Sequence, residues 1–262
     1  LAERGWICVA ANYRLSPSAS FPEHLVDCKR ALAWIRSEIE TFGGDPDFVV
    51  VTGGSAGGHL SAMMGLTAGD PEYQPGFENV DTRVAAAVPF YGIYDWSNAN
   101  GLQNSAGMRN FIGTKILKKS FDSDPDAFRR ASPLHRIHAD APPFYVIHGD
   151  SDSLCAVEEA RLFVEKLRET SKEPVAYAEV PGAQHAFDVF HVDRLDREGG
   201  GEIEARFHLA GVIAQRLDHA FFLRCHQMHA GCQQADAHDR HHGEREPALA
   251  AGALGKAEIG AA

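Results

Sequence analysis

The sequence predicts an α/β protein with a mostly parallel sheet and helices on both faces. Short apolar runs alternate with amphipathic stretches along the chain, and turns rich in glycine and proline separate them. Hydrophobic residues make up 44% of the 262 positions, which suffices for a sizeable core. We expect one folded domain over residues 1–222, and a low-complexity, poorly ordered tail over residues 223–262.

Five short apolar runs are the predicted strands. Their length and their position beside turn residues are typical of buried parallel strands. In chain order they cover residues 6–11, 48–51, 84–90, 144–147 and 175–180.

Four amphipathic stretches are the predicted helices. Residues 23–41 carry apolar side chains at helical spacing and end at two glycines. The other three stretches cover residues 58–67, 157–170 and 203–221, and the last of them is expected to pack on the sheet. Residues 98–130 are broken by three glycines, which suits a small lid-like insertion.

Composition excludes several classes of protein. The formal net charge of −11 disfavours nucleic-acid binding, because phosphate contacts require clustered Lys and Arg. No apolar run approaches the roughly 18 residues of a transmembrane helix. The five cysteines are odd in number and scattered, which favours reduced thiols and a cytoplasmic location. The sequence does not indicate an oligomeric state.

The second predicted strand leads directly into a G-x-S-x-G motif, Gly53-Gly54-Ser55-Ala56-Gly57. In the order strand, turn, helix, this motif is typical of a nucleophilic serine on a strained turn. We expect small residues beside the serine because side chains there would collide with the strand and helix that the turn joins. The turn places the Ser55 hydroxyl at a helix N-terminus, where the Ala56 N–H can stabilise developing negative charge.

A serine nucleophile needs a base, and the base needs an orienting carboxylate. His185 follows the last predicted strand in a Gly-containing loop and is the best candidate base. Asp152 follows the preceding strand and is favoured as the acid, with Asp150 as the alternative. The order serine, aspartate, histidine is the order that one class of α/β enzymes uses, with each residue after a strand.

Other candidate residues have structural interpretations at this stage. His59 is expected to pack or hydrogen-bond inside the nucleophile helix, and His148 to orient the loop of the acid. Asp95 is expected to fix a loop, with lining of the substrate pocket as the alternative. A cysteine- and histidine-containing group in the tail has no common zinc-site spacing, and no metal is predicted there. That group consists of Cys225, His226, His229 and Cys232.

Three segments of the chain resemble the α/β-hydrolase esterases. They are N-Y-R-L-S-P at residues 12–17, G-G-S-A-G-G at 53–58 and G-A-Q-H-A-F at 182–187. The sequence is most similar to the hormone-sensitive-lipase-like carboxylesterases and their bacterial, including mycobacterial, relatives. The resemblance covers about residues 1–190. It implies Ser55 as nucleophile, Asp152 as acid and His185 as base, small carboxylic esters of short to medium acyl chain as substrates, and no metal or organic cofactor.

The sequence departs from that family in one respect. The family carries an H-G-G motif upstream of the Y-R-L-x-P segment, and its backbone N–H groups form half of the oxyanion hole. This sequence begins after that position, so the resemblance implies an N-terminally truncated chain with an unpaired sheet edge. Loss of one oxyanion donor typically lowers turnover by about 10²- to 10³-fold. A peptidase or amidase of the same fold, or a catalytically impaired remnant, is the alternative.

Overall fold

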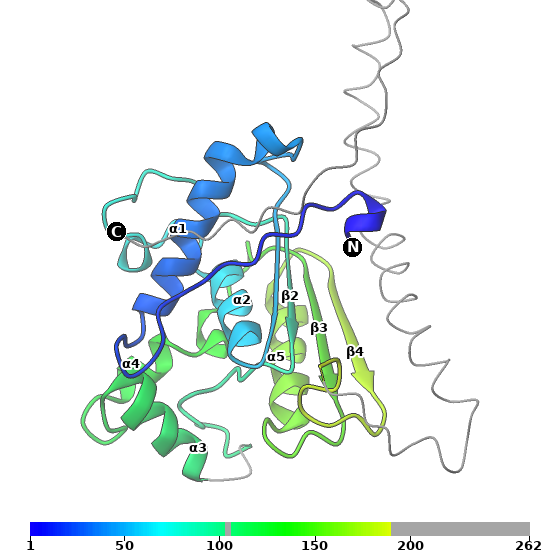
Figure 1. Cartoon of the computed structure of the whole chain (residues 1–262). Helices are drawn as coiled ribbons and strands as arrows, with labels where there is room; N and C mark the ends of the chain where they lie inside the picture. The colour runs from blue at the N-terminus through cyan, green and yellow to red at the C-terminus, as the bar shows by residue number, and fades with distance from the viewer. Residues whose placement is uncertain (103–105, 190–262) are drawn as a thin grey trace, which may run out of the picture. The chain divides into compact units, whose positions relative to one another are not determined.

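The computed structural model describes residues 1–102 and 106–189 of the chain. Within these residues, four strands form one sheet in the order β1-β2-β3-β4, and each neighbouring pair is parallel (Figure 1). Their bounds are β1 Val50–Gly54, β2 Ala86–Phe90, β3 Phe144–Gly149 and β4 Val175–Val180. The register aligns the carboxyl ends of the strands, so the loops that follow them meet at one edge of the sheet.

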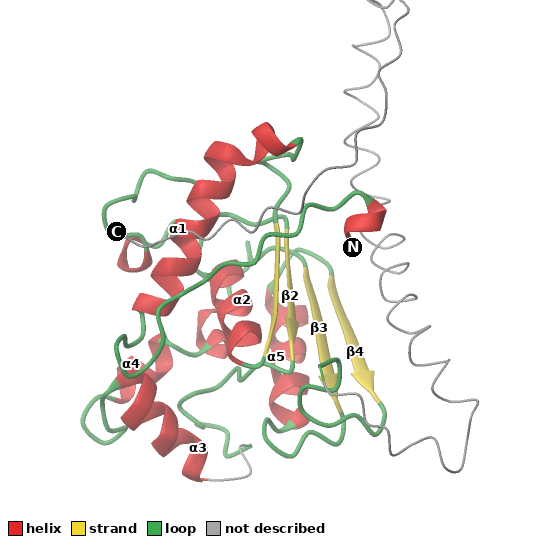
Figure 2. Ribbon diagram, viewed as in Figure 1, coloured by secondary structure: helices red, strands yellow, loops and turns green. Residues whose placement is uncertain are grey.

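Helices alternate with the strands, as the sequence predicts (Figure 2). The three longest helices of the described part of the chain are α1 Glu23–Glu38, α2 Ala56–Leu66 and α5 Val157–Thr170. Shorter 3₁₀ segments are η1 Ala2–Arg4, η2 Ile39–Phe42, η3 Pro71–Tyr73 and η5 Pro133–Arg136. The helical stretch after α1 ends where predicted, at Gly43, whose φ of 79° is open to glycine without a steric penalty.

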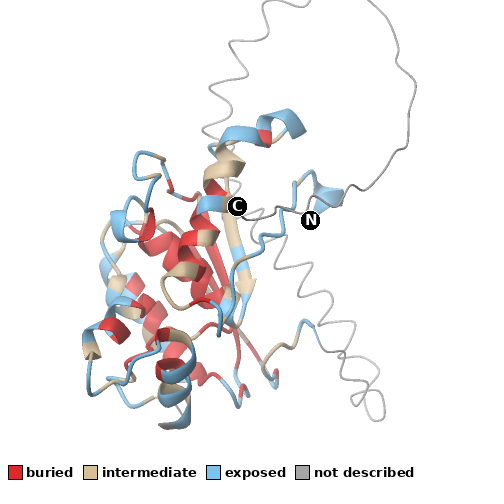
Figure 3. Ribbon diagram, turned by 60° about the vertical axis from the view of Figure 1, so that its left-hand side comes forward, coloured by how far each residue is buried: buried red, intermediate tan, exposed pale blue. Residues whose placement is uncertain are grey.

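The described helices α1, α2 and α5 pack on one face of the sheet. A single apolar cluster contains Leu66 of α2, Phe163 of α5 and the Phe144 ring of β3. A second cluster joins α1 to α2. Figure 3 shows that the buried residues gather where the helices meet the sheet. The helix predicted at residues 203–221 and the tail predicted at 223–262 lie outside the described residues.

The insertion predicted at residues 98–130 contains its own small core. Its helical segments are α3 Ala106–Phe111, the π-helical η4 Ile112–Leu117 and α4 Pro125–Arg130. Phe128 is fully buried and packs with Trp96, Ile112 and Leu117. The Phe21 N–H donates to the Ile116 carbonyl at 3.0 Å, so the insertion is tied to the loop before α1.

The prediction of a strand at residues 6–11 is wrong. This segment forms no strand, and its residues are mostly exposed, with Ile7 43% and Val9 40% exposed. An apolar run becomes a strand only where a neighbouring strand pairs with its backbone, and in the described residues no strand pairs with this one.

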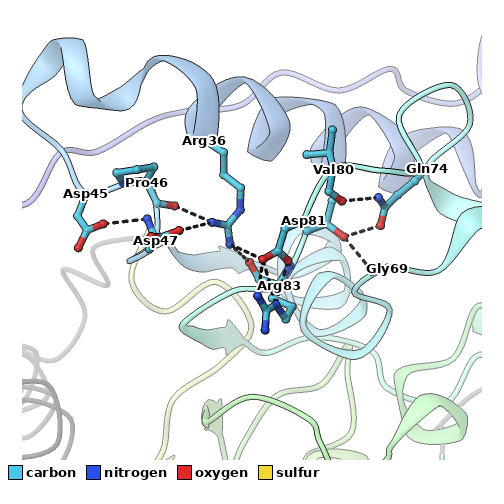
Figure 4. Close-up of polar contacts among 10 residues, drawn as sticks. Arg36, Asp45, Pro46, Asp47, Gly69, Gln74, Val80, Asp81 and Arg83 are labelled. Carbon is cyan, nitrogen blue, oxygen red and sulfur yellow. Dashed lines mark hydrogen bonds and ion pairs between the residues drawn. The ribbon is translucent and has the colours of Figure 1, made fainter. Parts of the chain in front are cut away.

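An arginine joins α1 to the loops that precede β1 and β2 (Figure 4). Arg36 donates to the carbonyl of Pro46 at 2.9 Å, to Asp47 at 3.1 Å and to the carbonyl of Arg83 at 2.7 Å. The Arg36 side chain is only 15% exposed, whereas its partner Asp47 is 91% exposed, so the guanidinium lies between the helix and the two loops with the carboxylate on the solvent side. The arginine therefore fixes the amino ends of the two strands, at the edge of the sheet opposite the loops that follow them.

None of the helices within residues 1–102 and 106–189 combines the length and the apolar character needed to cross a membrane.

Candidate active site

Ser55 occupies the turn between β1 and α2. Its backbone lies in the left-handed region, with φ of 57° and ψ of −114°, which is strained for a residue with a side chain. Two hydrogen bonds hold the strained turn: the Ser55 N–H donates to the Phe90 carbonyl at 3.0 Å, and the His59 N–H donates to the Ser55 carbonyl at 3.0 Å. The turn is therefore anchored both to the end of β2 and to the first turn of α2.

The glycines around Ser55 differ in how closely other atoms approach the position of a Cβ. A Cβ on Gly53 would lie 2.8 Å from the Gly57 backbone, and one on Gly54 would lie 2.5 Å from the Tyr91 hydroxyl. A Cβ on Gly57 would meet nothing within 4 Å, so the predicted steric reason for a glycine there is wrong. The close approach on the helix side occurs instead at Gly58, where a Cβ would lie 2.4 Å from the Phe90 carbonyl oxygen.

His185 lies in the turn after β4 and contacts both other members of the predicted group. Its Nε2 is 2.9 Å from Ser55 Oγ, and its Nδ1 is 2.8 Å from Asp152 Oδ2. With the proton on Nδ1, the ring donates to the carboxylate and accepts from the serine hydroxyl. Ser55, Asp152 and His185 are thus connected by hydrogen bonds through the imidazole. In the sequence, Asp152 lies 97 positions after Ser55 (152 − 55), and His185 lies 33 positions after Asp152 (185 − 152).

Asp152 is buried in the loop after β3. Burial alone would raise its pKa, but hydrogen bonds from two histidines and two backbone N–H groups outweigh burial and hold the pKa of Asp152 well below its ordinary value. The donors are His148, His185, Leu154 and Cys155. The carboxylate is therefore charged at neutral pH and faces His185.

Asp150, the alternative acid, makes its hydrogen bonds with neighbouring loop residues. Its Oδ1 accepts from the Gly182 N–H at 2.7 Å and from the Ser151 hydroxyl at 2.8 Å. Asp150 therefore fixes the turn after β4.

Ala56 is the first residue of α2 and follows Ser55 directly. Its N–H belongs to the first turn of a helix, whose N–H groups have no acceptor within the helix. The N–H and the helix dipole favour negative charge close to the Ser55 hydroxyl.

Three further residues have the structural contacts that their sequence context suggests. His59 is buried, stacks on Trp96 with ring centroids 4.1 Å apart, and its Nε2 lies 2.7 Å from the Ala131 carbonyl. His148 Nε2 lies 2.9 Å from the Cys155 carbonyl, within the loop that carries the acid. Asp95 is buried and accepts from the N–H groups of its own loop.

The sequence interpretation missed Tyr91 and Cys155. The Tyr91 ring lies 4.8 Å from the His185 ring, and its position directly after a strand was the available signal. Cys155, Asp152 and His185 have ligand-type atoms within 4.8 Å of one another. The Asp152 and His185 atoms bond to each other there, and burial raises the pKa of the Cys155 thiol, so the group is poorly suited to a metal. The cysteine- and histidine-containing group of the tail lies outside the described residues.

The sheet is parallel, and a serine on a strained strand–helix turn is hydrogen-bonded to a histidine that is itself hydrogen-bonded to an aspartate. This combination defines a protein of the α/β-hydrolase fold. The family model BD-FAE matches residues 1–167, and the chain belongs to this family of α/β-hydrolases.

The chain is similar to two esterases of Mycobacterium tuberculosis. It is 53% identical to the probable carboxylic ester hydrolase LipM over 72% of this chain and 44% of that protein. It is 46% identical to the esterase LipQ, also over 72% of this chain and 44% of that protein. The chain therefore spans just under half the length of these curated relatives.

Solved structures of esterases share the fold. A thermophilic esterase of Thermogutta terrifontis, Est2, superimposes with a TM-score of 0.61 at 25% identity, over 80% of this chain and 69% of that one. A truncated carbohydrate esterase from gut microbiota gives a TM-score of 0.58 at 27% identity, over 66% and 65%.

Proposed function

We propose that this chain carries the catalytic centre of a serine carboxylesterase that hydrolyses carboxylic esters of short to medium acyl chain. The observation that supports this most directly is the hydrogen-bonded series from Ser55 through His185 to Asp152. A serine hydroxyl is a weak nucleophile, and a neutral imidazole held against it by a charged carboxylate is the arrangement that activates it.

In the first half of the proposed reaction, Ser55 Oγ attacks the ester carbonyl carbon while His185 Nε2 takes the hydroxyl proton. Asp152 keeps the other imidazole proton on Nδ1 and stabilises the imidazolium that forms. The Ala56 N–H donates to the developing oxyanion, where a donor at a helix N-terminus is most effective. The C–O bond to the alcohol then breaks, and His185 returns the proton to the departing alkoxide.

In the second half, a water molecule attacks the acyl group on Ser55, and His185 again takes the proton. The tetrahedral intermediate collapses, the bond between the acyl carbon and Ser55 Oγ breaks, and His185 reprotonates the serine. The products are a carboxylic acid and an alcohol, and the residues return to their starting state.

The names of the relatives support the ester class and a short acyl group. The mycobacterial proteins are named as an ester hydrolase and an esterase. The Thermogutta terrifontis esterase was also solved with propionate and with butyrate bound, with TM-scores of 0.59 and 0.61 to this chain.

The test is labelling of the full chain with a fluorophosphonate probe, combined with a panel of p-nitrophenyl esters and aminoacyl amides. We expect the wild type to be labelled and to prefer the esters, and Ser55→Ala to lose both labelling and turnover. A folded wild-type sample without labelling would contradict the proposal. A preference for the amides would instead indicate a peptidase or amidase.

The two neighbouring aspartates provide a matched control within that assay. Asp152→Asn keeps the shape but removes the charge that faces His185, and we expect the labelling rate to fall by about 10³- to 10⁴-fold. Asp150→Asn changes only the turn after β4, and we expect labelling within a few-fold of the wild type. Equal losses in both variants would argue against Asp152 as the acid.

A further inference from the structure

Tyr91 follows β2 directly, and backbone hydrogen bonds on both sides fix its position. Its N–H donates to the Ile147 carbonyl of β3 at 2.8 Å, and the carbonyl of the preceding residue, Phe90, accepts from the Ser55 N–H. Its φ of 35° lies in the left-handed region, which costs free energy for a bulky residue. The side chain is 2% exposed and is directed by this backbone toward the Ser55 turn.

The Tyr91 ring packs against both the nucleophile turn and the base. It contacts the His185 ring edge-on, with centroids 4.8 Å apart and planes at 62°, and contacts the Phe187 ring at 5.5 Å. Its hydroxyl lies so close to Gly54 that a Cβ there would come within 2.5 Å of it. A ring in this position limits how far the imidazole can turn away from Ser55.

The Tyr91 hydroxyl donates to the Asp188 carboxylate at 2.5 Å. Asp188 is exposed and lies three residues after His185, in a segment where Ala186 has φ of 57° and its carbonyl accepts from the Val189 N–H at 3.0 Å. Burial and the neighbouring Asp188 carboxylate raise the pKa of Tyr91, so its hydroxyl is protonated and can donate throughout the neutral range. One bond therefore connects a buried ring below the site to the exposed end of the loop that carries the base.

We propose that Tyr91 and Asp188 are positioning residues for the reaction: the bond between them holds the His185 loop over the Ser55 turn, so that the imidazole contacts serine and aspartate together. This inference rests on the proposed function. The imidazole must satisfy two short contacts on opposite sides of one ring, at 2.9 Å and 2.8 Å. A misplacement of about 1 Å at such a site can cost about 10²-fold in rate.

The test compares two tyrosine-to-phenylalanine variants of the full chain. Tyr91→Phe keeps the ring and removes only the hydroxyl, and we expect kcat to fall by about 10- to 100-fold with KM within about twofold. Tyr177→Phe is the matched control, because its hydroxyl donates to Glu179 at 2.8 Å on β4, away from the site. We expect Tyr177→Phe to keep the wild-type kcat, with similar melting temperatures for both variants.

Asp188 variants test the acceptor of the same bond. We expect Asp188→Ala to lower kcat by the same factor as Tyr91→Phe, and the double variant to lower it no further than either single variant. The amide oxygen of Asp188→Asn can still accept the hydrogen bond, so we expect this variant to keep most of the wild-type kcat. Equal kcat in the wild type and Tyr91→Phe would overturn this inference. The proposed esterase function is tested separately, by the loss of turnover in Ser55→Ala. Additive losses in the double variant would overturn it as well.

A second measurement does not depend on turnover. The Nδ1 proton of His185, which is shared with Asp152, is observable as a low-field proton NMR signal. We expect its exchange with water to be faster in Tyr91→Phe and Asp188→Ala than in the wild type and Tyr177→Phe. The same exchange rate in all four proteins would overturn the inference, whether or not the chain hydrolyses esters.

Discussion

Gly57 and Gly58 are adjacent in the sequence but have different surroundings. A Cβ on Gly57 would point into open space, whereas one on Gly58 would lie 2.4 Å from the Phe90 carbonyl and 3.0 Å from the Gly92 backbone. The Phe90 carbonyl is also the acceptor for the Ser55 N–H. Close approach of α2 to the end of β2 therefore requires glycine at position 58, and this approach holds the nucleophile turn in place.

The prediction at the residue scale contrasts alanine at these two positions. We expect Gly58→Ala to lower the free energy of unfolding by about 3 kcal/mol, because backbone has to move to admit the Cβ. We expect Gly57→Ala to be neutral or to add up to about 1 kcal/mol, since alanine has the higher helix propensity. Urea denaturation of both variants measures the difference. Equal stability would show that α2 can move away from β2 at little cost.

Single residues also differ in how far the sequence could predict them. Ser55, His185 and Asp152 could be selected because each follows a predicted strand and the chain order is typical of one fold. Asp152 could only be favoured over Asp150, because two positions in one loop have the same local pattern. Tyr91 follows a strand too, but its role depends on Asp188, which is 97 positions away (188 − 91).

At the scale of elements, α1 contains a cation that its amphipathic pattern does not predict. Lys29 is fully buried, and its ammonium donates to the Thr67 carbonyl and lies 3.4 Å from Gln74 Oε1. Gln74 in turn donates to the Val80 carbonyl at 3.0 Å, in the network that Figure 4 shows next to the Arg36 contacts. Burial lowers the pKa of Lys29 to about 8.

This pKa predicts a rise in stability in alkaline solution. Between about pH 8 and pH 10.5 the unfolded chain binds a proton at Lys29 that the folded chain does not, so the free energy of unfolding increases with pH. Below pH 8 both states are protonated and the penalty is constant. We expect the wild type to gain about 1 to 3 kcal/mol across this window relative to Lys29→Met.

Denaturant titrations of both proteins at several pH values measure this difference. Lys115→Met, at an exposed position, is the control and is expected to keep the wild-type dependence on pH. If Lys29→Met shows the wild-type dependence as well, the Lys29 ammonium is not the group that titrates.

At the scale of the whole described chain, apolar residues form separate clusters. One joins α2 and α5 to the sheet, another joins α1 to α2, and one more lies within the insertion around Phe128. Segments with few contacts to the main core open at lower free energy than the core itself. The insertion is therefore expected to unfold locally.

Phe128→Ala tests this expectation. We expect the variant to lose hydrogen-exchange protection over residues 106–131 while α5 keeps it, since the cavity destabilises the insertion by about 3 to 5 kcal/mol. Phe163→Ala, in the cluster of the sheet, is the matched control and should lower protection of α2, α5 and the strands together. Uniform loss of protection in Phe128→Ala would show that the insertion and the sheet unfold as one unit.

The sequence by itself determined the order of strands and helices within residues 23–180. It also singled out Ser55, Asp152 and His185, each of which follows a strand. Those features depend on local patterns: apolar runs, helical spacing and glycines at turns. The tertiary structure decided that residues 6–11 form no strand, that Gly58 rather than Gly57 needs to be glycine, and that Tyr91 meets Asp188. Each of these depends on which distant backbone or side chain lies opposite, and no local pattern carries that information.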